Sequence, residues 1–403
     1  MAENDSKFKF IGENLPVRIL FLCSRILPQI RSGTDLRVQS QIASSVKLAP
    51  TAVFSIEHSK AQPVPGVEIW SSGDSDKKTA NFRNTKFISE LISDNAGPYQ
   101  HRYNESTASK LRQFLNEFEP DHIIVSKLDQ TVYLEILENY KKAKLILDLD
   151  ESSLQILQSI GPIISNRVAR LLNTKIYKMI CAYESRILPR FSQIWVSSEI
   201  EVARIKNQYG LQIPVVNIPN SIDFKQYAPE SVHKIPKQII FPANFGHYPN
   251  EDAAKFMANQ IIPIMKGFRF QFVGSAMPKW MQELSIKNLE IISSVPSMAP
   301  FIQKAGIMFI PLRAGAGTRL KALEAFACKT PVVSTRIGIE GLGVEDRKHV
   351  LLAETPEEFA NVTSELISKP DLYNHLAESA YEYGLDRFSY ETIFQLIKNE
   401  LQV

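Results

Sequence analysis

The residues with the clearest chemical potential lie in segment 311–335, where two cations follow a glycine loop. Gly315 and Gly317 let backbone N–H groups approach a ligand where a Cβ would clash, and Arg319 and Lys321 come directly after them. The apolar spacing that follows predicts a helix, whose first turn has free N–H groups and the positive end of a dipole. Glycines, cations and a helix start together favour binding of a phosphate or diphosphate.

A carboxylate, Glu324, follows Lys321 by about one helical turn. Its charge does not suit a phosphate, but a carboxylate accepts hydrogen bonds from two hydroxyl groups and therefore suits a sugar diol. A simpler interpretation is also open, because a Lys and a Glu three residues apart on a helix are usually a solvated pair worth about 0.2–0.5 kcal/mol. Two glycines separated by one residue are likewise a weak motif.

Apolar strands must position this loop. Residues 306–310 predict a buried strand of a parallel sheet, and residues 332–335 begin the next strand. A second loop of the same kind follows the apolar run 17–23, where Gly33 comes just before a predicted helix with Arg37 nearby. A plain strand-to-helix turn that needs one glycine explains Gly33 equally well.

The composition is that of an ordinary soluble protein with 44% apolar and 22% charged residues. A length of 403 residues predicts two domains, and a net charge of +3 is too small to indicate nucleic-acid binding. Three widely spaced cysteines in apolar surroundings indicate free thiols in a reducing compartment. The amino terminus is polar and acidic, unlike a signal peptide, so we expect a cytoplasmic protein.

Residues 324–327 (Glu-Ala-Phe-Ala) and 331–335 (Pro-Val-Val-Ser-Thr) resemble the C-terminal half of the group 1, family 4, retaining glycosyltransferases. The resemblance covers nearly the whole chain and is sharpest between Asn217 and Arg387. It implies an α/β fold of two Rossmann-like domains that face each other across a cleft, the GT-B fold. It also implies that a sugar moves from a nucleotide-diphosphate donor to a hydroxyl of a glycan, lipid or protein acceptor, with retention and without a metal or other cofactor.

The resemblance, together with a proline-rich polar stretch, divides the chain into four parts. We expect an acceptor-side domain at residues 1–218, a linker at 219–237, and a nucleotide-sugar-binding domain at 238–385. Residues 386–403 should form a terminal helix that crosses back to the first domain.

The resemblance also implies which residues bind the donor. The Glu that matches Glu324 holds the ribose hydroxyls, and the glycine loop holds the diphosphate. Arg319 and Lys321 are the candidate catalytic residues, because positive charge at a departing diphosphate lowers the barrier. The expected donor-binding residues are Gly33, Asn244, Ser294, Val295, Gly315, Ala316, Gly317, Thr318, Arg319, Lys321, Glu324 and Glu340.

Two departures from the family pattern matter. Many members carry another Glu eight residues before Glu324, where it contacts the donor sugar, and this chain has Ala316 there. Other members place an Arg and a Lys in the turn after the first strand of the C-terminal domain, whereas residues 241–254 contain neither. The positive charge for the diphosphate then falls to Arg319 and Lys321, with backbone donors.

Asp148 and Asp150 form an Asp-x-Asp triad, which is a metal-binding signature of another glycosyltransferase fold. Alternate residues of a strand point to opposite faces, whereas a Mg²⁺ site needs both carboxylates to converge, so we expect no metal here. The resemblance instead places this strand end at the floor of the cleft. Asp150, Glu151 and His101 are therefore the acceptor-side candidates.

Residues 164–190 predict a long helix with an apolar side and an excess of cations. Peripheral contact with the inner face of a membrane is one interpretation. The other is packing on the sheet with solvated cations, which we expect because the cations do not collect on one stripe of the helix.

Two other functions stay open, since one fold can host several chemistries. A nucleotide-sugar epimerase or hydrolase would release nucleotide without an acceptor. A non-catalytic partner would bind a glycan or another transferase, and the missing Glu at position 316 favours that alternative.

Overall fold

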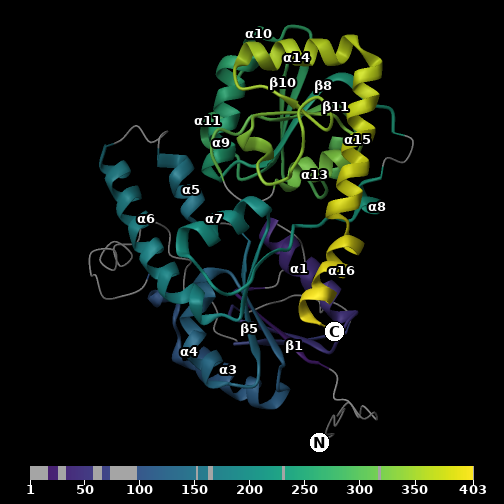
Figure 1. The fold of residues 1–403 in the computed structure, drawn as a ribbon. Coiled ribbons are helices and arrows are strands. Elements are labelled where there is room, and N and C mark those ends of the chain that lie inside the picture. The colour runs from purple at the N-terminus through teal and green to yellow at the C-terminus, as the bar shows by residue number, and fades with distance from the viewer. Residues whose placement is uncertain are drawn as a thin grey trace, which may run out of the picture.

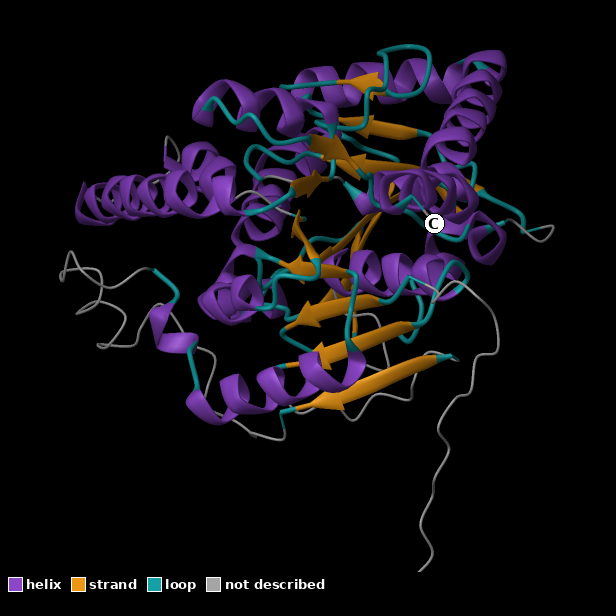
Figure 2. Ribbon diagram, turned by 60° about the horizontal axis from the view of Figure 1, so that its bottom comes forward, coloured by secondary structure: helices purple, strands orange, loops and turns teal. Residues whose placement is uncertain are grey.

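The computed structural model describes residues 17–25, 33–57, 66–72, 98–150, 153–161, 167–228, 232–315 and 319–402. These residues form two parallel sheets, one in each half of the chain, with helices on both faces of each sheet (Figures 1 and 2). This architecture confirms the predicted fold class of two Rossmann-like α/β domains.

The first domain is built on a seven-stranded sheet with the strand order β3-β2-β1-β4-β5-β6-β7. Its strands are β1 (Ile19–Cys23), β2 (Thr51–Ser55), β3 (Val67–Ser71), β4 (His122–Ser126), β5 (Lys144–Leu149), β6 (Gln193–Val196) and β7 (Val215–Asn217). The larger helices are α1 (Gly33–Val46), α3 (Glu105–Phe118), α4 (Leu134–Asn139), α5 (Ser153–Ile160), α6 (Arg167–Ile187) and α7 (Glu199–Tyr209). Short helical turns are η1 (Gln100–Arg102), η2 (Leu128–Tyr133) and η4 (Leu188–Arg190).

The second domain is built on a six-stranded sheet with the order β10-β9-β8-β11-β12-β13. Its strands are β8 (Ile235–Asn244), β9 (Arg269–Ser275), β10 (Leu289–Ser293), β11 (Ala305–Ile310), β12 (Val332–Ser334) and β13 (Leu351–Leu352). The helices that pack around it are α8 (Phe224–Tyr227), α9 (Tyr248–Phe256), η5 (Met257–Ile261), α10 (Ile262–Ile264), α11 (Lys279–Gln282), α12 (Ala299–Lys304), α13 (Leu320–Ala327), η6 (Ile337–Ile339), α14 (Pro356–Ser368) and α15 (Pro370–Phe388).

The central strands are buried on both faces, which explains their continuous apolar sequences. β1, β2, β4 and β11 are buried at every residue. In the first sheet β1 pairs in parallel with β2 and β4, and in the second sheet β8 pairs with β9 and β11. The strand order reverses at these points, and ligands of open α/β sheets bind beside the carboxyl ends of strands at such a reversal.

The chain crosses between the two domains twice, and the crossings lie side by side. At the first crossing the Ile222 N–H donates to the Phe388 carbonyl at 3.1 Å. At the second crossing Ser389 ends α15 and caps α16 (Tyr390–Leu401), its hydroxyl accepting from the Thr392 N–H. α16 then packs against α1 of the first domain, where the yellow and purple helices meet in Figure 1.

Helix α6 departs from the expected packing. Its C-terminal half packs into the core through the buried residues Ile180, Tyr183, Glu184 and Ile187, whereas its N-terminal half pairs with α5. The N-terminal half projects from the first domain and leaves large apolar side chains exposed (Figure 1). The expectation that the whole helix packs on the sheet is therefore wrong for this half. Within the described ranges, none of the helices is both long and apolar enough to span a bilayer.

Candidate active site

The glycine loop and the start of α13 hold a guanidinium group in a fixed place. Arg319 directly precedes α13, and its side chain is 8% exposed. Its Nε donates to the Ile337 carbonyl at 3.2 Å. A Cβ on Gly315 would lie 3.1 Å from both terminal guanidinium nitrogens, and the φ of Gly315 is +134°. Glycine at this position therefore admits both the backbone conformation and the arginine.

Lys321 reaches from α13 to the turn between β8 and α9. Its Nζ donates to Asn250 Oδ1 at 2.9 Å and lies 4.7 Å from the centre of the Phe241 ring. Burial and the Arg319 charge lower the Lys321 pKa to about 7, although the Glu324 carboxylate raises it. Lys321 therefore supplies positive charge to the turn whose own sequence lacks Arg and Lys.

His247 is a third basic side chain near Arg319 and Lys321. It directly precedes α9, and burial lowers its pKa, with further lowering by the charges of Lys321 and Arg319. The cationic cluster, which we define as Arg319, Lys321 and His247, therefore contains groups that disfavour one another's protonation. A bound anion would relieve this repulsion.

Glu324 is held by a residue that the sequence indicated only as linker. The Tyr227 hydroxyl, at the end of α8, donates to Glu324 Oε1 at 2.9 Å. Burial raises the Glu324 pKa, and burial also raises the Tyr227 pKa, with the Glu324 charge adding to the shift of the tyrosine. A carboxylate has about four lone-pair positions, so this bond leaves acceptor capacity for hydroxyl groups.

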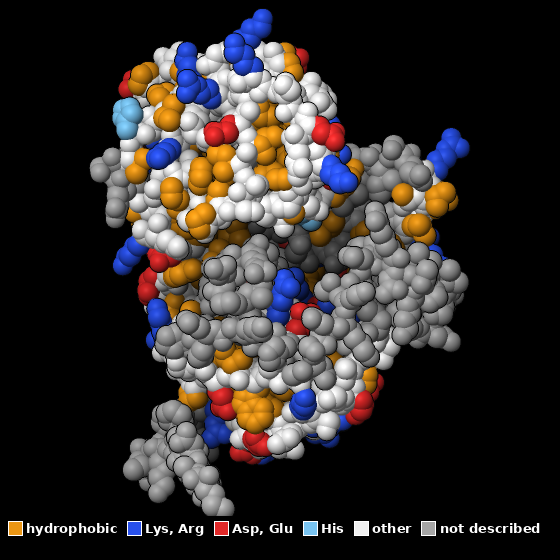
Figure 3. Space-filling model, turned by 180° about the vertical axis from the view of Figure 1, so that it is seen from behind, with side chains coloured by type: hydrophobic (Ala, Val, Ile, Leu, Met, Phe, Trp, Pro, Cys, Tyr) orange, Lys and Arg blue, Asp and Glu red, His pale blue; other side chains and the backbone are white. Residues whose placement is uncertain are grey.

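A cavity of about 260 Å³ lies between the domains on another side of the glycine loop. Figure 3 shows the surface hollowed where the two domains meet. The residues that line the cavity are Gln155, Gln158, Ser159, Gly315, Ile337 and Glu340. Helix α5 of the first domain contributes the amides and the hydroxyl, and the second domain contributes the carboxylate. Amides, a hydroxyl and one carboxylate suit the hydroxyl groups of a neutral sugar.

Two hydrogen bonds join the domains at this cavity. The Gln155 amide donates to Glu340 Oε2 at 2.5 Å, and the Gly315 N–H donates to Ser159 Oγ at 3.0 Å. Burial raises the Glu340 pKa, while the Arg319 charge lowers it. Glu340 therefore interacts electrostatically with the cationic cluster and is hydrogen-bonded to the first domain.

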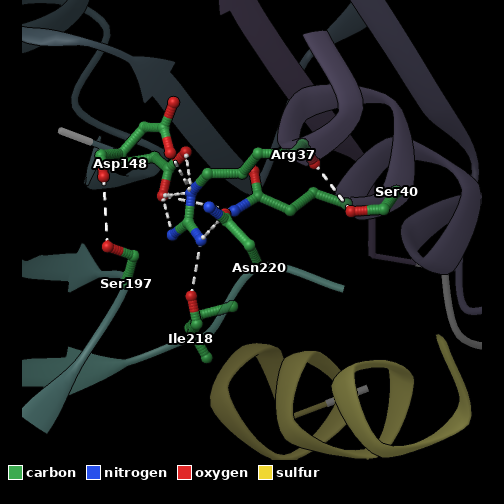
Figure 4. A network of polar contacts seen from close by, with 8 residues as sticks. Arg37, Ser40, Asp148, Ser197, Ile218 and Asn220 are labelled. Carbon is green, nitrogen blue, oxygen red and sulfur yellow. Dashed lines mark hydrogen bonds and ion pairs between the residues drawn. The ribbon is translucent and has the colours of Figure 1, made fainter. Parts of the chain in front are cut away.

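The first domain contains a separate polar network at the floor of the interdomain region (Figure 4). Arg37 Nε lies 3.0 Å from both carboxylate oxygens of Asp148, and Nη2 lies 2.5 Å from Oδ1. Arg37 Nη1 donates to the Ile218 carbonyl at 2.6 Å and to Asn220 Oδ1 at 2.9 Å. Both charged side chains are 1% exposed. Arg37 thus ties α1 and β5 to the first interdomain crossing, and is not oriented toward a phosphate as its sequence position suggested.

Asp150 lies at the edge of the same network. One of its carboxylate oxygens is 4.0 Å from Arg37 Nε, and its carbonyl accepts from Ser197 Oγ at 3.1 Å. Within the described part of the chain, no group of three or more His, Cys, Asp or Glu side chains is placed to hold a metal ion.

The remaining predicted residues occupy several places. A Cβ on Gly33 would lie 2.9 Å from Leu320 Cδ1, so the start of α1 abuts the start of α13. Asn244 Oδ1 accepts from the Gly246 N–H at 3.0 Å and stabilises the turn after β8. Ser294 has a φ of +57°, and Val295 packs partly buried on the core of the second domain.

Other predicted residues lie apart or outside the described residues. The structure places His101 in η1, which packs against η2 within the first domain. Ala316, Gly317, Thr318 and Glu151 lie outside the described residues. The structure therefore brings together Gly33, Gly315, Arg319, Lys321, Glu324 and Glu340 from the predicted set, and adds Tyr227, His247, Asn250 and Gln155.

Comparison with known proteins shows what the chain is similar to. The family model for glycosyl transferases group 1 matches residues 236–369. An uncharacterised glycosyltransferase of Methanocaldococcus jannaschii, MJ1178, is 28% identical over 190 residues, which are 43% of this chain and 54% of that protein. The chain thus spans about half the length of this curated relative.

Solved structures share the fold over nearly the whole chain. Sucrose-phosphate synthase from Thermosynechococcus elongatus has a TM-score of 0.71 at 14% identity, covering 96% of this chain and 98% of its own. Anabaena HepE, in complex with UDP and glucose, has a TM-score of 0.65 at 15% identity, covering 96% and 99%. The chain is therefore a two-domain protein of the GT-B fold, and residues 236–369 of its second domain match the family model for glycosyl transferases group 1.

Proposed function

We propose that this protein transfers a sugar from a nucleoside-diphosphate donor to a hydroxyl acceptor, with retention of configuration and without a metal. The observation that carries this proposal is that Gly315 lies against the Arg319 guanidinium of the cationic cluster and also lines the interdomain cavity. The cluster suits a diphosphate, and the cavity suits the sugar attached to it. The named glycosyltransferases with the same fold, including one bound to UDP and glucose, support this assignment.

The diphosphate lies against Arg319 and Lys321 in this proposal. Lys321 has a pKa near 7, so it is only partly protonated at neutral pH in the free protein. An anion between Arg319, Lys321 and His247 favours the protonated form of both titratable groups. Binding of the donor therefore recruits positive charge to the atom that must leave.

The nucleoside extends toward Glu324 and the loop after β10. Glu324 accepts the ribose hydroxyls, with Tyr227 fixing one of its oxygens. The nucleobase lies near Ser294 and Val295, where the positive φ of Ser294 turns the backbone. These positions follow from the family resemblance together with the observed placement of Glu324.

The transferred sugar occupies the cavity beside Glu340. This carboxylate takes the place of the one that position 316 lacks, because Glu340 lines the same cavity as the neighbouring Gly315. The Gln155 amide holds Glu340 from the first domain. The sugar is therefore read by groups that belong to both domains.

In the reaction, the bond between the anomeric carbon and the diphosphate oxygen breaks as the acceptor oxygen bonds to the same face of the sugar. The departing phosphate oxygen takes the acceptor's proton. Negative charge grows on the diphosphate in the transition state, so Arg319 and Lys321 stabilise it more than the bound donor. The two interdomain hydrogen bonds hold the domains together around the sugar and reduce access of water.

A thermal melting screen with UDP, GDP, dTDP and CMP tests the donor site. Without metal, one nucleoside diphosphate at a hundred times its Kd should stabilise the protein by about 2.7 kcal/mol. No stabilisation by any nucleotide, or stabilisation only with Mg²⁺ or Mn²⁺, contradicts the proposed metal-free site. Release of nucleotide from the matching donor without an acceptor would instead favour an epimerase or hydrolase.

We also propose that the protein works in the cytoplasm. Cys23 and Cys328 are buried free thiols, and burial raises the pKa of each to about 12. Cysteines of this kind are typical of reducing compartments.

A further inference from the structure

The projecting half of α6 exposes three large apolar side chains on one helical segment. Leu171 is 72% exposed, Val168 is 66% exposed and Leu172 is 46% exposed. Figure 3 shows apolar and cationic side chains together on the segment that projects at the right, which is α6 seen from behind. Scattered apolar residues are normal on a protein surface, but a cluster within one helical turn and a half indicates an interaction surface.

The same segment carries four cations and no acid. Arg167, Arg170, Lys175 and Lys178 are all exposed, and the next acidic residue along the helix is Glu184. At about 100° per residue, the four cations fall within about 140° of the helix circumference, and Val168, Leu171 and Leu172 extend this exposed side to about 200°. The cations therefore do collect on one side, contrary to the expectation from the sequence, and they share that side with the apolar residues.

The segment is held firmly by α5. Asn173 donates from its amide to the Leu157 carbonyl at 2.9 Å, and Gln158 donates from its amide to the Tyr177 hydroxyl at 2.8 Å. These contacts lie on the side of α6 that faces the protein. The exposed side is therefore presented outward by a helix that is anchored to the rest of the domain.

We propose that residues 167–178 of α6 form a docking surface for an anionic lipid bilayer. Apolar side chains beside cations on one helix side match an interfacial helix, which buries the apolar groups at the acyl boundary and keeps the cations at the phosphates. A second copy of this chain is a poor occupant, because a symmetric contact would place these cations against their own copies. The surface projects and is not grooved, so it fits a flat bilayer.

Docking of residues 167–178 also places the interdomain cavity relative to the bilayer. Helix α5 lines the cavity through Gln155, Gln158 and Ser159, and the same helix pairs with α6. This arrangement suits an acceptor that is carried in the bilayer. This inference about the acceptor rests on the proposed function.

Flotation of the full chain with lipid vesicles tests the surface without measuring activity. The protein should float with vesicles containing 30% phosphatidylglycerol in phosphatidylcholine at 0.1 M salt, and much less with pure phosphatidylcholine. The triple variant Val168→Ser, Leu171→Ser, Leu172→Ser should weaken binding to the anionic vesicles at least tenfold. The pair Arg170→Gln, Lys175→Gln should remove most of the preference for anionic lipid.

Two control variants match these changes elsewhere on the surface. Ile264→Ser removes an apolar side chain that is 45% exposed in the second domain, and Lys206→Gln removes an exposed cation on α7; neither should alter flotation. Absence of flotation with anionic vesicles overturns the proposal, as does equal binding by the wild type and the triple variant. A dimer in light scattering that the triple variant abolishes also overturns it, because α6 would then be a protein interface. A folded chain that binds nucleotide but not vesicles separates this failure from failure of the proposed function.

Discussion

The two arginines that follow glycine loops in the two domains have opposite surroundings. Arg37 of the first domain has a carboxylate, a carbonyl and an amide oxygen as hydrogen-bond partners, and it is almost fully buried. Arg319 of the second domain donates to the Ile337 carbonyl and lies near Lys321 and His247, whose pKa values its charge lowers. An arginine paired with a buried carboxylate holds elements together, whereas an arginine beside a lysine and a histidine favours binding of an anion. The partners, more than the residue type, decide between a structural and a binding role.

The largest effect should come from disrupting the hydrogen-bond network of Arg37. Arg37→Ala leaves the Asp148 carboxylate buried without its partner, so the free energy of unfolding should fall by about 3–5 kcal/mol. Urea denaturation measures the change. The control is Arg112→Ala, whose ion pair with Glu105 is exposed by 51% and 70%, and which should leave the free energy of unfolding nearly unchanged. Equal losses in the two variants would show that the Arg37 network contributes little to stability.

Disrupting the cationic cluster should affect catalysis more than folding. Lys321→Ala should lower turnover by about 10²–10³-fold, because the lysine acts on charge that develops as the diphosphate leaves. Steady-state kinetics and the donor Kd measure the two effects separately. Lys329→Ala, just beyond the C-terminal end of α13, is the control because Lys329 pairs with Glu378 and lies over the Tyr381 ring, away from the cationic cluster. A weaker donor affinity with normal turnover at saturation would make Lys321 a uniform binding residue.

The carboxylate of Glu324 lies about one turn further along α13 than Lys321 and should act on the nucleoside and not on the diphosphate. Glu324→Gln keeps the shape of the side chain and removes its charge, so nucleotide affinity should fall by about 1.5–3 kcal/mol with the fold intact. Isothermal titration calorimetry measures this change. Tyr227→Phe keeps the charge and removes one hydrogen bond, so its effect should be smaller, about 0.5–1.5 kcal/mol. Unchanged affinity in Glu324→Gln would return Glu324 to the solvated-pair interpretation.

Comparing the binding of a nucleoside diphosphate with that of its sugar nucleotide tests whether the diphosphate and the sugar occupy different places around Gly315. Glu340→Gln should weaken binding of the sugar nucleotide by about 1.5–3 kcal/mol and leave binding of the nucleoside diphosphate unchanged. The control is Glu345→Gln, an exposed carboxylate paired with Lys348. Equal weakening of both ligands would place Glu340 at the diphosphate or at the domain contact and not at the sugar.

The smallest effect concerns pH. The free protein carries a proton on Lys321 below pH 7, and a bound diphosphate raises its pKa, so binding above pH 7 must take up a proton. Affinity for the nucleoside diphosphate should therefore fall by up to about tenfold per pH unit above pH 7. Calorimetry in two buffers with different ionisation enthalpies counts the protons. A wild-type profile as flat as that of Lys321→Ala would contradict this coupling.

Much of the fold could be predicted because its signals are local. The apolar run at residues 306–310 and the helical spacing after Thr318 correspond to β11 and α13, since each depends on neighbouring residues alone. The candidate glycine loop and Glu324 were visible for the same reason.

Partners that are distant in sequence could not be predicted in this way. Tyr227 bonds Glu324 across 97 positions, and Gln155 bonds Glu340 across 185 positions. Arg37 follows a glycine loop, so its sequence position suggested contact with a phosphate. Its partner in the structure, Asp148, lies 111 positions away, and no local pattern indicates that contact. The periodicity of α6 likewise revealed its apolar residues but not which of them other elements cover.

The paired interdomain crossings restrict how the two domains can move. Because the segments at Ile222 and Phe388 are hydrogen-bonded to each other, they act as one hinge and leave rotation about a single axis as the easiest motion. Opening about this hinge must separate Gln155 from Glu340 and Ser159 from Gly315, since each pair spans the domains. α16 stays on α1 throughout, because it belongs to the first domain as a packed body. The two hydrogen bonds must therefore break when the domains open to admit a sugar and form again when the domains close around it.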